Sequence, residues 1–213
     1  MIVDPETLAL FALASAVLIA VPGPAVLYIV TRSIHQGRQA GVAGALGIEV
    51  GALMHVAFAA VGLSAVLASS AIAFGVVKYV GAAYLIGVGL WTLLSRGDEA
   101  DVRLGRDRRL RRVFAQGVVV NAFNPKVALF FLAFLPQFVD PKGVHPAVQI
   151  AFLGLVFVTI ALVLDVGWAL AAGTAGGVLR RSRLFVRVQR YVSGSVFVGL
   201  GVATALAGSE ARK

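Results

Sequence analysis

The chain has 213 residues, of which 59% are hydrophobic and only 14% are charged. Soluble domains average about 25% charged residues, so this composition indicates an integral membrane protein. The formal net charge of +9 could suggest a nucleic-acid partner, but the arginines gather in two hydrophilic breaks, seven within residues 96–112 and five within residues 180–190. Membrane proteins carry such an excess in cytoplasmic loops, which explains the charge and argues against nucleic-acid binding.

Six stretches are long and apolar enough for the roughly 20 residues that a transmembrane helix needs. In chain order we expect spans at residues 5–31, 39–67, 71–94, 113–139, 147–172 and 187–207. Asp4 and Glu6 precede the first stretch where a signal peptide would carry basic residues, so we expect this stretch to stay as a span. The predicted fold is an all-α integral membrane protein with six transmembrane helices in one domain, residues 1–213.

The distribution of basic residues between the spans predicts the orientation. Arg32 and Arg38 lie in the first loop, seven arginines in the third and five in the fifth, whereas the second loop has no Arg or Lys and the fourth has only Lys142. The odd-numbered loops are therefore expected in the cytoplasm, with both termini outside.

Prolines interrupt the first and fourth spans, at Val21-Pro22-Gly23-Pro24 and at Asn124-Pro125. Proline ends a helix, and irregular backbone at membrane depth is tolerated only where protein packs on it or where it lines a cavity. Each break can start a new half-helix whose free N–H groups favour an anion. Lys126 adds a full charge that the helix dipole disfavours there, so we expect a nearby anion or carbonyl group. A packing kink explains either break alone equally well.

The two halves of the chain repeat these features. The first and fourth spans are broken, and the second and fifth each hold one acid, Glu49 and Asp165. Three spans per half make the second half enter from the opposite side, as in an inverted repeat. We therefore predict a first three-helix repeat in residues 1–95, a cytoplasmic basic loop in residues 96–112 and a second three-helix repeat in residues 113–213.

The acids inside the spans are candidates for an ion or proton path, because ionisable residues at membrane depth usually face the interior of the bundle. The alternative for Asp165 is a structural pair with Lys126, or a neutral acid that binds a carbonyl group. Lys78 in the third span either reaches the membrane surface or contributes to a cavity. His55 shares a helix face with Gly47 and Gly51, where a packing role is as common as proton transfer.

Catalytic and cofactor signatures are absent from the sequence. There is no HExxH, GxSxG, GxGxxG or phosphate-loop motif, and there is no cysteine. The three histidines lie in different loops and spans, so no metal site is predicted. The sequence thus predicts neither an enzyme nor a cofactor-binding protein.

The chain resembles the LysE/RhtB superfamily of bacterial amino-acid exporters over nearly its whole length. The matching stretches are residues 21–24 (VPGP), 45–51 with His55, 62–65 (GLSA), 77–85 (VKYVGAAYL), 121–126 (NAFNPK) and 134–138 (FLPQF). The motif positions carried over from the family are Pro22, Gly23, Pro24, Lys78, Asn124, Pro125, Lys126 and the acid of the fifth span, Asp165. Glu49 is a candidate through its position inside a span alone.

The resemblance implies a six-span exporter in the bacterial inner membrane that moves amino acids out of the cytoplasm, with proton-motive force as the energy source. The candidate substrate-binding residues are Pro22, Gly23, Pro24, Asn124, Pro125, Lys126 and Asp165. The proton-coupling candidates are Asp165, Glu49, Lys78 and His55. The alternatives are a small membrane channel or subunit and a polytopic membrane enzyme. Basic, neutral and sulfur-containing amino acids all stay open as substrates, and a homodimer is one option for assembly.

Overall fold

The computed structural model describes residues 2–63, 109–140 and 145–179, with single residues between positions 76 and 94 and between 191 and 205. The ordered elements of these segments are α1 (Pro5–Ala20), α2 (Pro24–Gln36), α3 (Arg38–Phe58), the π-helix η1 (Ala59–Leu63), α6 (Leu110–Ala122), α7 (Pro125–Leu129), the π-helix η2 (Phe130–Phe134), the 3-10 helix η3 (Leu135–Phe138) and α8 (Pro146–Leu179). The described residues form no strand, so the predicted all-α class is confirmed for them.

The first helix begins at a capping residue followed by proline. The Asp4 side chain accepts a hydrogen bond of 2.9 Å from the amide of Thr7, and Pro5 takes the first helical position, where no amide hydrogen is needed. Hydrogen bonding by the side chain and the amide of Thr7 lowers the pKa of Asp4. α1 ends at Ala20, directly before the first proline motif.

A single glycine turns the chain from α2 into α3. Gly37 has φ 90°, a left-handed value that side chains with a Cβ atom disfavour, and it both ends α2 and precedes α3. The connection between α2 and α3 is therefore this one residue.

α3 packs against α2, α6 and α8, and it approaches α6 most closely through glycine. A Cβ atom at Gly47 would lie 2.1 Å from the carbonyl oxygen of Phe114, and one at Gly117 would lie 2.6 Å from the carbonyl oxygen of Gly44. Small residues on both helices thus let the two backbones touch, as the spacing of Gly47 and Gly51 leads one to expect in a membrane bundle.

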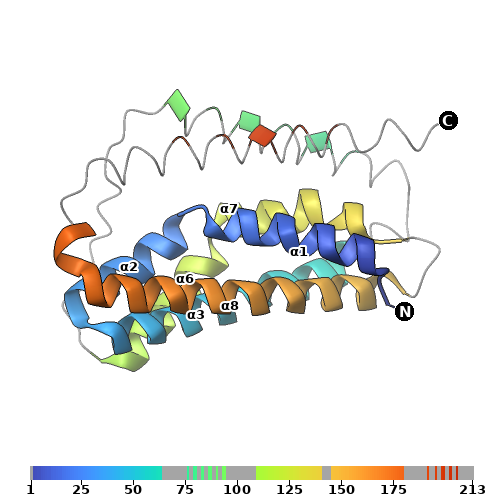
Figure 1. Cartoon of the computed structure of the whole chain (residues 1–213). Helices are drawn as coiled ribbons and strands as arrows, with labels where there is room; N and C mark the ends of the chain where they lie inside the picture. Colours follow the sequence, from blue (N-terminus) through green and yellow to red (C-terminus); the bar gives the residue numbers. More distant parts are fainter. Residues whose placement is uncertain are drawn as a thin grey trace.

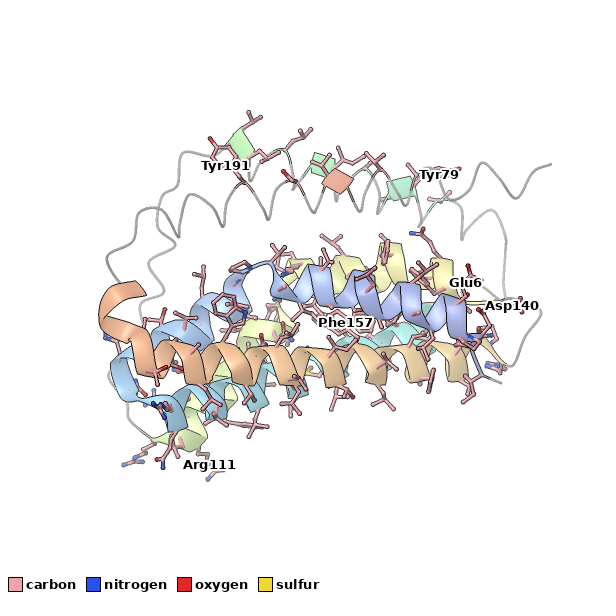
Figure 2. All side chains as sticks on the ribbon, viewed as in Figure 1. Glu6, Tyr79, Arg111, Asp140, Phe157 and Tyr191 are labelled. Carbon is pink, nitrogen blue, oxygen red and sulfur yellow. The ribbon has the colours of Figure 1, made fainter. Side chains whose placement is uncertain are left out.

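The described helices form a bundle along which α8 runs, with α1 and α7 above α8 in this view and α3 and α6 passing behind it (Figure 1). Glu6 and Asp140 lie at one end of the bundle and Arg111 lies at the opposite end (Figure 2). α1 and α8 therefore start at the same end, and α6 starts at the other.

The predicted breaks in the first and fourth spans are present. The pair α1 and α2 is bent by 53°, and the pair Leu110–Ala122 and Pro125–Phe138 by 44°. Two further described helices, Arg38–Gly62 and Pro146–Thr174, are long and apolar enough to cross a membrane, so the described part contains up to four spans. The predicted spans at residues 71–94 and 187–207 lie outside the described segments except for single residues, and the inverted repeat stays a prediction.

Three helices extend beyond the predicted spans. Arg32 was assigned to the first loop, and this was wrong, because α2 continues to Gln36 and Arg32 is buried within it. α6 begins at Leu110, so Arg111 and Arg112 lie in its first turn, and the cytoplasmic basic loop at residues 96–112 stays a prediction. α8 continues past residue 172, the predicted end of the fifth span, to Leu179.

Candidate functional site

The first helix break leaves a helix start without a capping side chain. The backbone is extended at Val21 and at Gly23, and Pro24 opens α2. No side chain accepts a hydrogen bond at the start of α2, and Gly23 precedes it as the cap residue. Pro24 has no amide hydrogen and the amide of Leu27 donates to the carbonyl oxygen of Gly23, so Ala25 and Val26 carry the amides that no side chain caps.

The second break is closed by two asparagines. Asn124 caps α7, because its Oδ1 accepts a hydrogen bond of 3.1 Å from the amide of Lys126. Its Nδ2 donates to Oδ1 of Asn121 at 3.0 Å, and Nδ2 of Asn121 donates to the carbonyl oxygen of Ile48 at 2.8 Å. This chain of hydrogen bonds fixes the break against the middle of α3.

Lys126 connects the two breaks. Its side chain is buried, and its Nζ donates a hydrogen bond of 2.5 Å to the carbonyl oxygen of Val21. A Cβ atom at Gly23 would lie 3.3 Å from Cδ of Lys126, so the lysine stem passes directly over the first break. The carbonyl group expected near this lysine is therefore one that the end of α1 supplies.

Two buried acids face this lysine. Glu49 on α3 is 5% exposed and Asp165 on α8 is 3% exposed. Their carboxyl groups interact with each other, and Asp165 also interacts electrostatically with Lys126. Neither oxygen of Glu49 meets a hydrogen-bond donor among the described residues.

The acids, the lysine and both breaks line one cavity with a volume of about 30 Å³. This volume holds about two water molecules. The remainder of the wall is mostly apolar, and the cavity is lined by Leu18, Ile19, Gly23, Ala25, Val26, Ile48, Glu49, Ala52, Asn121, Asn124, Lys126, Val127, Phe157, Ala161 and Asp165.

The cavity brings together five of the residues singled out from the sequence, Gly23, Glu49, Asn124, Lys126 and Asp165. The three prolines of the motifs do not line it. Pro24 and Pro125 are exposed, and Pro22 is partly buried outside the lining. The prolines thus shape the breaks while their neighbours face the cavity. Lys78 lies outside the described residues.

His55 also lies outside the cavity lining. Its Nε2 is 2.9 Å from the carbonyl oxygen of Asn121, and its ring stacks on Phe131 with centroids 6.4 Å apart. In this structure His55 joins α3 to the end of α6.

Sequence reasoning missed two polar features. Asn121 holds the second break, and its place in the sequence three residues before the cap residue Asn124 was the available signal. Arg32 contacts Oε1 of Gln116 and lies 5.4 Å from the Tyr28 ring, while the Tyr28 hydroxyl donates to the carbonyl oxygen of Val113 at 2.6 Å. The four-residue spacing of Tyr28 and Arg32 marks this second polar contact between α2 and α6.

No group of three or more His, Asp or Glu side chains in the described ranges is arranged to hold a metal ion. Paired helix breaks that meet at a cavity with buried acids and a buried lysine, within an apolar helical bundle, are a pattern typical of membrane transporters.

The LysE type translocator family matches residues 16–208, and the chain belongs to this family. The resemblance seen in the sequence is thereby confirmed. The chain is a multi-pass membrane protein of the exporter type, and its family consists of transporters rather than enzymes.

Curated relatives match the chain over almost their full length. The homoserine/homoserine lactone efflux protein of Salmonella typhimurium is 29% identical over 197 residues, 92% of this chain and 95% of the relative. An uncharacterized membrane protein of Pseudomonas aeruginosa is 32% identical over 203 residues, 89% of this chain and 90% of the relative. One of Vibrio cholerae is 28% identical over 186 residues, 87% of this chain and 90% of the relative. No solved structure matches the chain.

Proposed function

We propose that the chain is a proton-coupled antiporter that exports amino acids, or close derivatives of them, across the bacterial inner membrane. Membership of the translocator family and the efflux activity named for the Salmonella relative support export of a small amino-acid-like molecule. The single observation that carries the proposal is the cavity in which Glu49, Asp165 and Lys126 meet the two helix breaks.

The cavity offers complementary groups for a zwitterion. The uncapped start of α2 and the Lys126 ammonium lie on one wall and suit the substrate carboxylate. Glu49 and Asp165 suit the substrate ammonium. Asn124 is engaged with the amide of Lys126, so in this proposal the start of α2 provides the main backbone donors.

Proton coupling follows from competition at the acid pair. An ionised carboxylate binds the substrate ammonium, and its protonation removes the charge that holds the ammonium. A proton that enters from outside therefore releases the substrate, and loss of that proton to the cytoplasm restores the binding site.

The cavity must widen for this cycle, because a volume of about 30 Å³ cannot hold an amino acid. In the proposal, the two inverted three-helix halves rock against each other and open the cavity to one side at a time.

Odd-numbered loops face the cytoplasm and both termini face outward in this proposal. The protein assembles as a homodimer or acts alone.

Reconstituted protein tests the proposal. Proteoliposomes are loaded with labelled amino acids, and a proton gradient directed into the lumen is imposed. The wild-type protein should release label in response to the gradient, whereas Asp165→Asn and Lys126→Ala should not. Glu6→Gln, which alters an exposed acid at the end of the bundle, is the matched control and should behave as wild type. Unchanged release by Asp165→Asn and Lys126→Ala would remove the mechanism.

A further inference from the structure

We infer that the amino acid carried through this cavity has a small, neutral, apolar side chain, and that Ala52 and Ala161 set its size. The inference rests on the proposed function and adds the class of substrate. It follows from where the charged and apolar parts of the cavity wall lie.

The two alanines lie next to the acids on the same side. Ala52 follows Glu49 by three residues on α3, and Ala161 precedes Asp165 by four residues on α8, so each shares a helix face with its acid. α3 runs toward the end of the bundle at which α1 starts, and α8 runs away from it (Figure 1). Both alanines are therefore displaced from the acids toward that same end.

Beyond the acids the cavity wall is apolar and ends at an aromatic ring. Ala52 and Ala161 are buried and line the cavity together with Phe157, which lies one turn before Ala161 on α8. The Phe157 ring packs against Phe130 and Phe131, with centroid distances of 5.0 and 5.2 Å. A long side chain would have to displace this closed aromatic cluster.

The charges of the wall exclude a charged side chain. Among the described lining residues the ionisable groups are Glu49, Asp165 and Lys126, and the two carboxyl groups are adjacent. In the proposal both carboxyl groups bind the α-ammonium group of the substrate. The side-chain cation of a basic amino acid would lie several bonds away from that group, against alanine and phenylalanine. An acidic side chain would lie against the same apolar wall. Either charge would lose its hydration without a partner.

The test uses the full-length protein in proteoliposomes loaded with one labelled amino acid at a time, from glycine, alanine, valine, phenylalanine, lysine and glutamate. Wild-type protein should release glycine and alanine fastest, and lysine and glutamate at least about tenfold more slowly. Ala161→Val should lower release of valine relative to alanine by about tenfold, because added methylene groups in a pocket discriminate by about 10- to 200-fold. Ala161→Gly should raise the valine-to-alanine ratio.

Ala171→Val, on the exposed face of α8, is the matched control and should leave the ratios unchanged. Lysine or glutamate as the best wild-type substrate would overturn the inference and leave the proposed function standing. A wild-type protein that releases none of the amino acids would instead contradict the proposed function. If Ala161→Val does not fold, the ratio measured for Ala161→Gly decides the role of Ala161, and an unchanged ratio overturns it.

Discussion

Lys126 brings a full positive charge to the point where the two helix breaks meet. It is buried and its Nζ binds the carbonyl oxygen of Val21, so the same group that holds the breaks together also interacts with Asp165. In the proposed cycle a substrate carboxylate competes with this carbonyl oxygen, which links substrate binding to the contact between the two breaks.

Replacement of Lys126 by methionine separates its role in transport from its role in stability. We expect Lys126→Met to slow release of labelled alanine by about tenfold or more, because a hydrogen bond to a charged group contributes about 1.5–3 kcal/mol. The melting temperature in detergent should fall, since the buried carbonyl oxygen of Val21 and the Asp165 carboxyl group lose their partner. Arg111→Met removes an exposed cation and serves as the control. Wild-type rates in Lys126→Met would exclude the lysine from the site.

The acid pair predicts a specific defect in coupling. Glu49→Gln leaves Asp165 to bind the substrate ammonium but removes one of the two carboxyl groups that can take up a proton, so exchange of labelled for unlabelled alanine should persist while release driven by a proton gradient is lost. The two assays on the same proteoliposomes check this difference. Gradient-driven release at the wild-type rate would show that Glu49 has no part in coupling.

At the residue scale the sequence identified the acids and the lysine because charges are rare in apolar stretches and therefore conspicuous. It did not identify Asn121 as the anchor of the second break, because its partner, the carbonyl oxygen of Ile48, belongs to another helix. It likewise misassigned Arg32 to a loop, because burial of that side chain depends on Gln116 and Tyr28 rather than on neighbouring sequence.

At the scale of elements, α3 and α6 are the helices whose packing positions the cavity. Asn121 near the end of α6 holds α3, and Gly47 lets the two backbones meet. A Cβ atom added at Gly47 would be only 2.1 Å from the Phe114 carbonyl oxygen, so a backbone must move to accept it.

We therefore expect Gly47→Ala to lower the free energy of unfolding by about 1–3 kcal/mol, the usual range for overpacking. Gly167→Ala is the matched control, because a Cβ atom there meets nothing within 4 Å. Replacement of that helical glycine by alanine should stabilise by about 0.5–1 kcal/mol. Thermal unfolding in detergent measures both. Equal melting temperatures for the two variants would contradict the close contact between α3 and α6.

The breaks in the first and fourth spans were predictable because proline acts locally on the helix that contains it. The bend angles and the meeting of the two breaks at one cavity were not, since they depend on how α1, α2 and α7 pack around α3 and α8. The length of α8 beyond the predicted span was not predictable for a related reason: Gly173 packs closely on Arg38, so tertiary contact keeps a glycine-rich stretch helical.

At the scale of the whole molecule, the ends of the bundle differ in charge in the way that the predicted orientation requires. Glu6 and Asp140 lie at one end and Arg111 at the other (Figure 2). The chain contains no cysteine, so a single introduced thiol reports its own position without background.

We expect Glu6→Cys to react with a membrane-impermeant thiol reagent in intact cells whose outer membrane has been made permeable. Arg111→Cys should react only after the inner membrane has been opened, because the basic end faces the cytoplasm. Mass shifts of the two purified variants provide the measurement. The reverse pattern would invert the orientation and with it the direction assigned to transport.

The most direct measurement of the central claim is the pH of the lumen of proteoliposomes that contain a pH-sensitive dye. A gradient of alanine from the lumen to the medium, with no initial pH difference, should acidify the lumen as alanine leaves, because each release step brings a proton inward through Asp165 and Glu49. Asp165→Asn should abolish this acidification. Export of alanine by the wild-type protein with an unchanged lumenal pH would contradict the account.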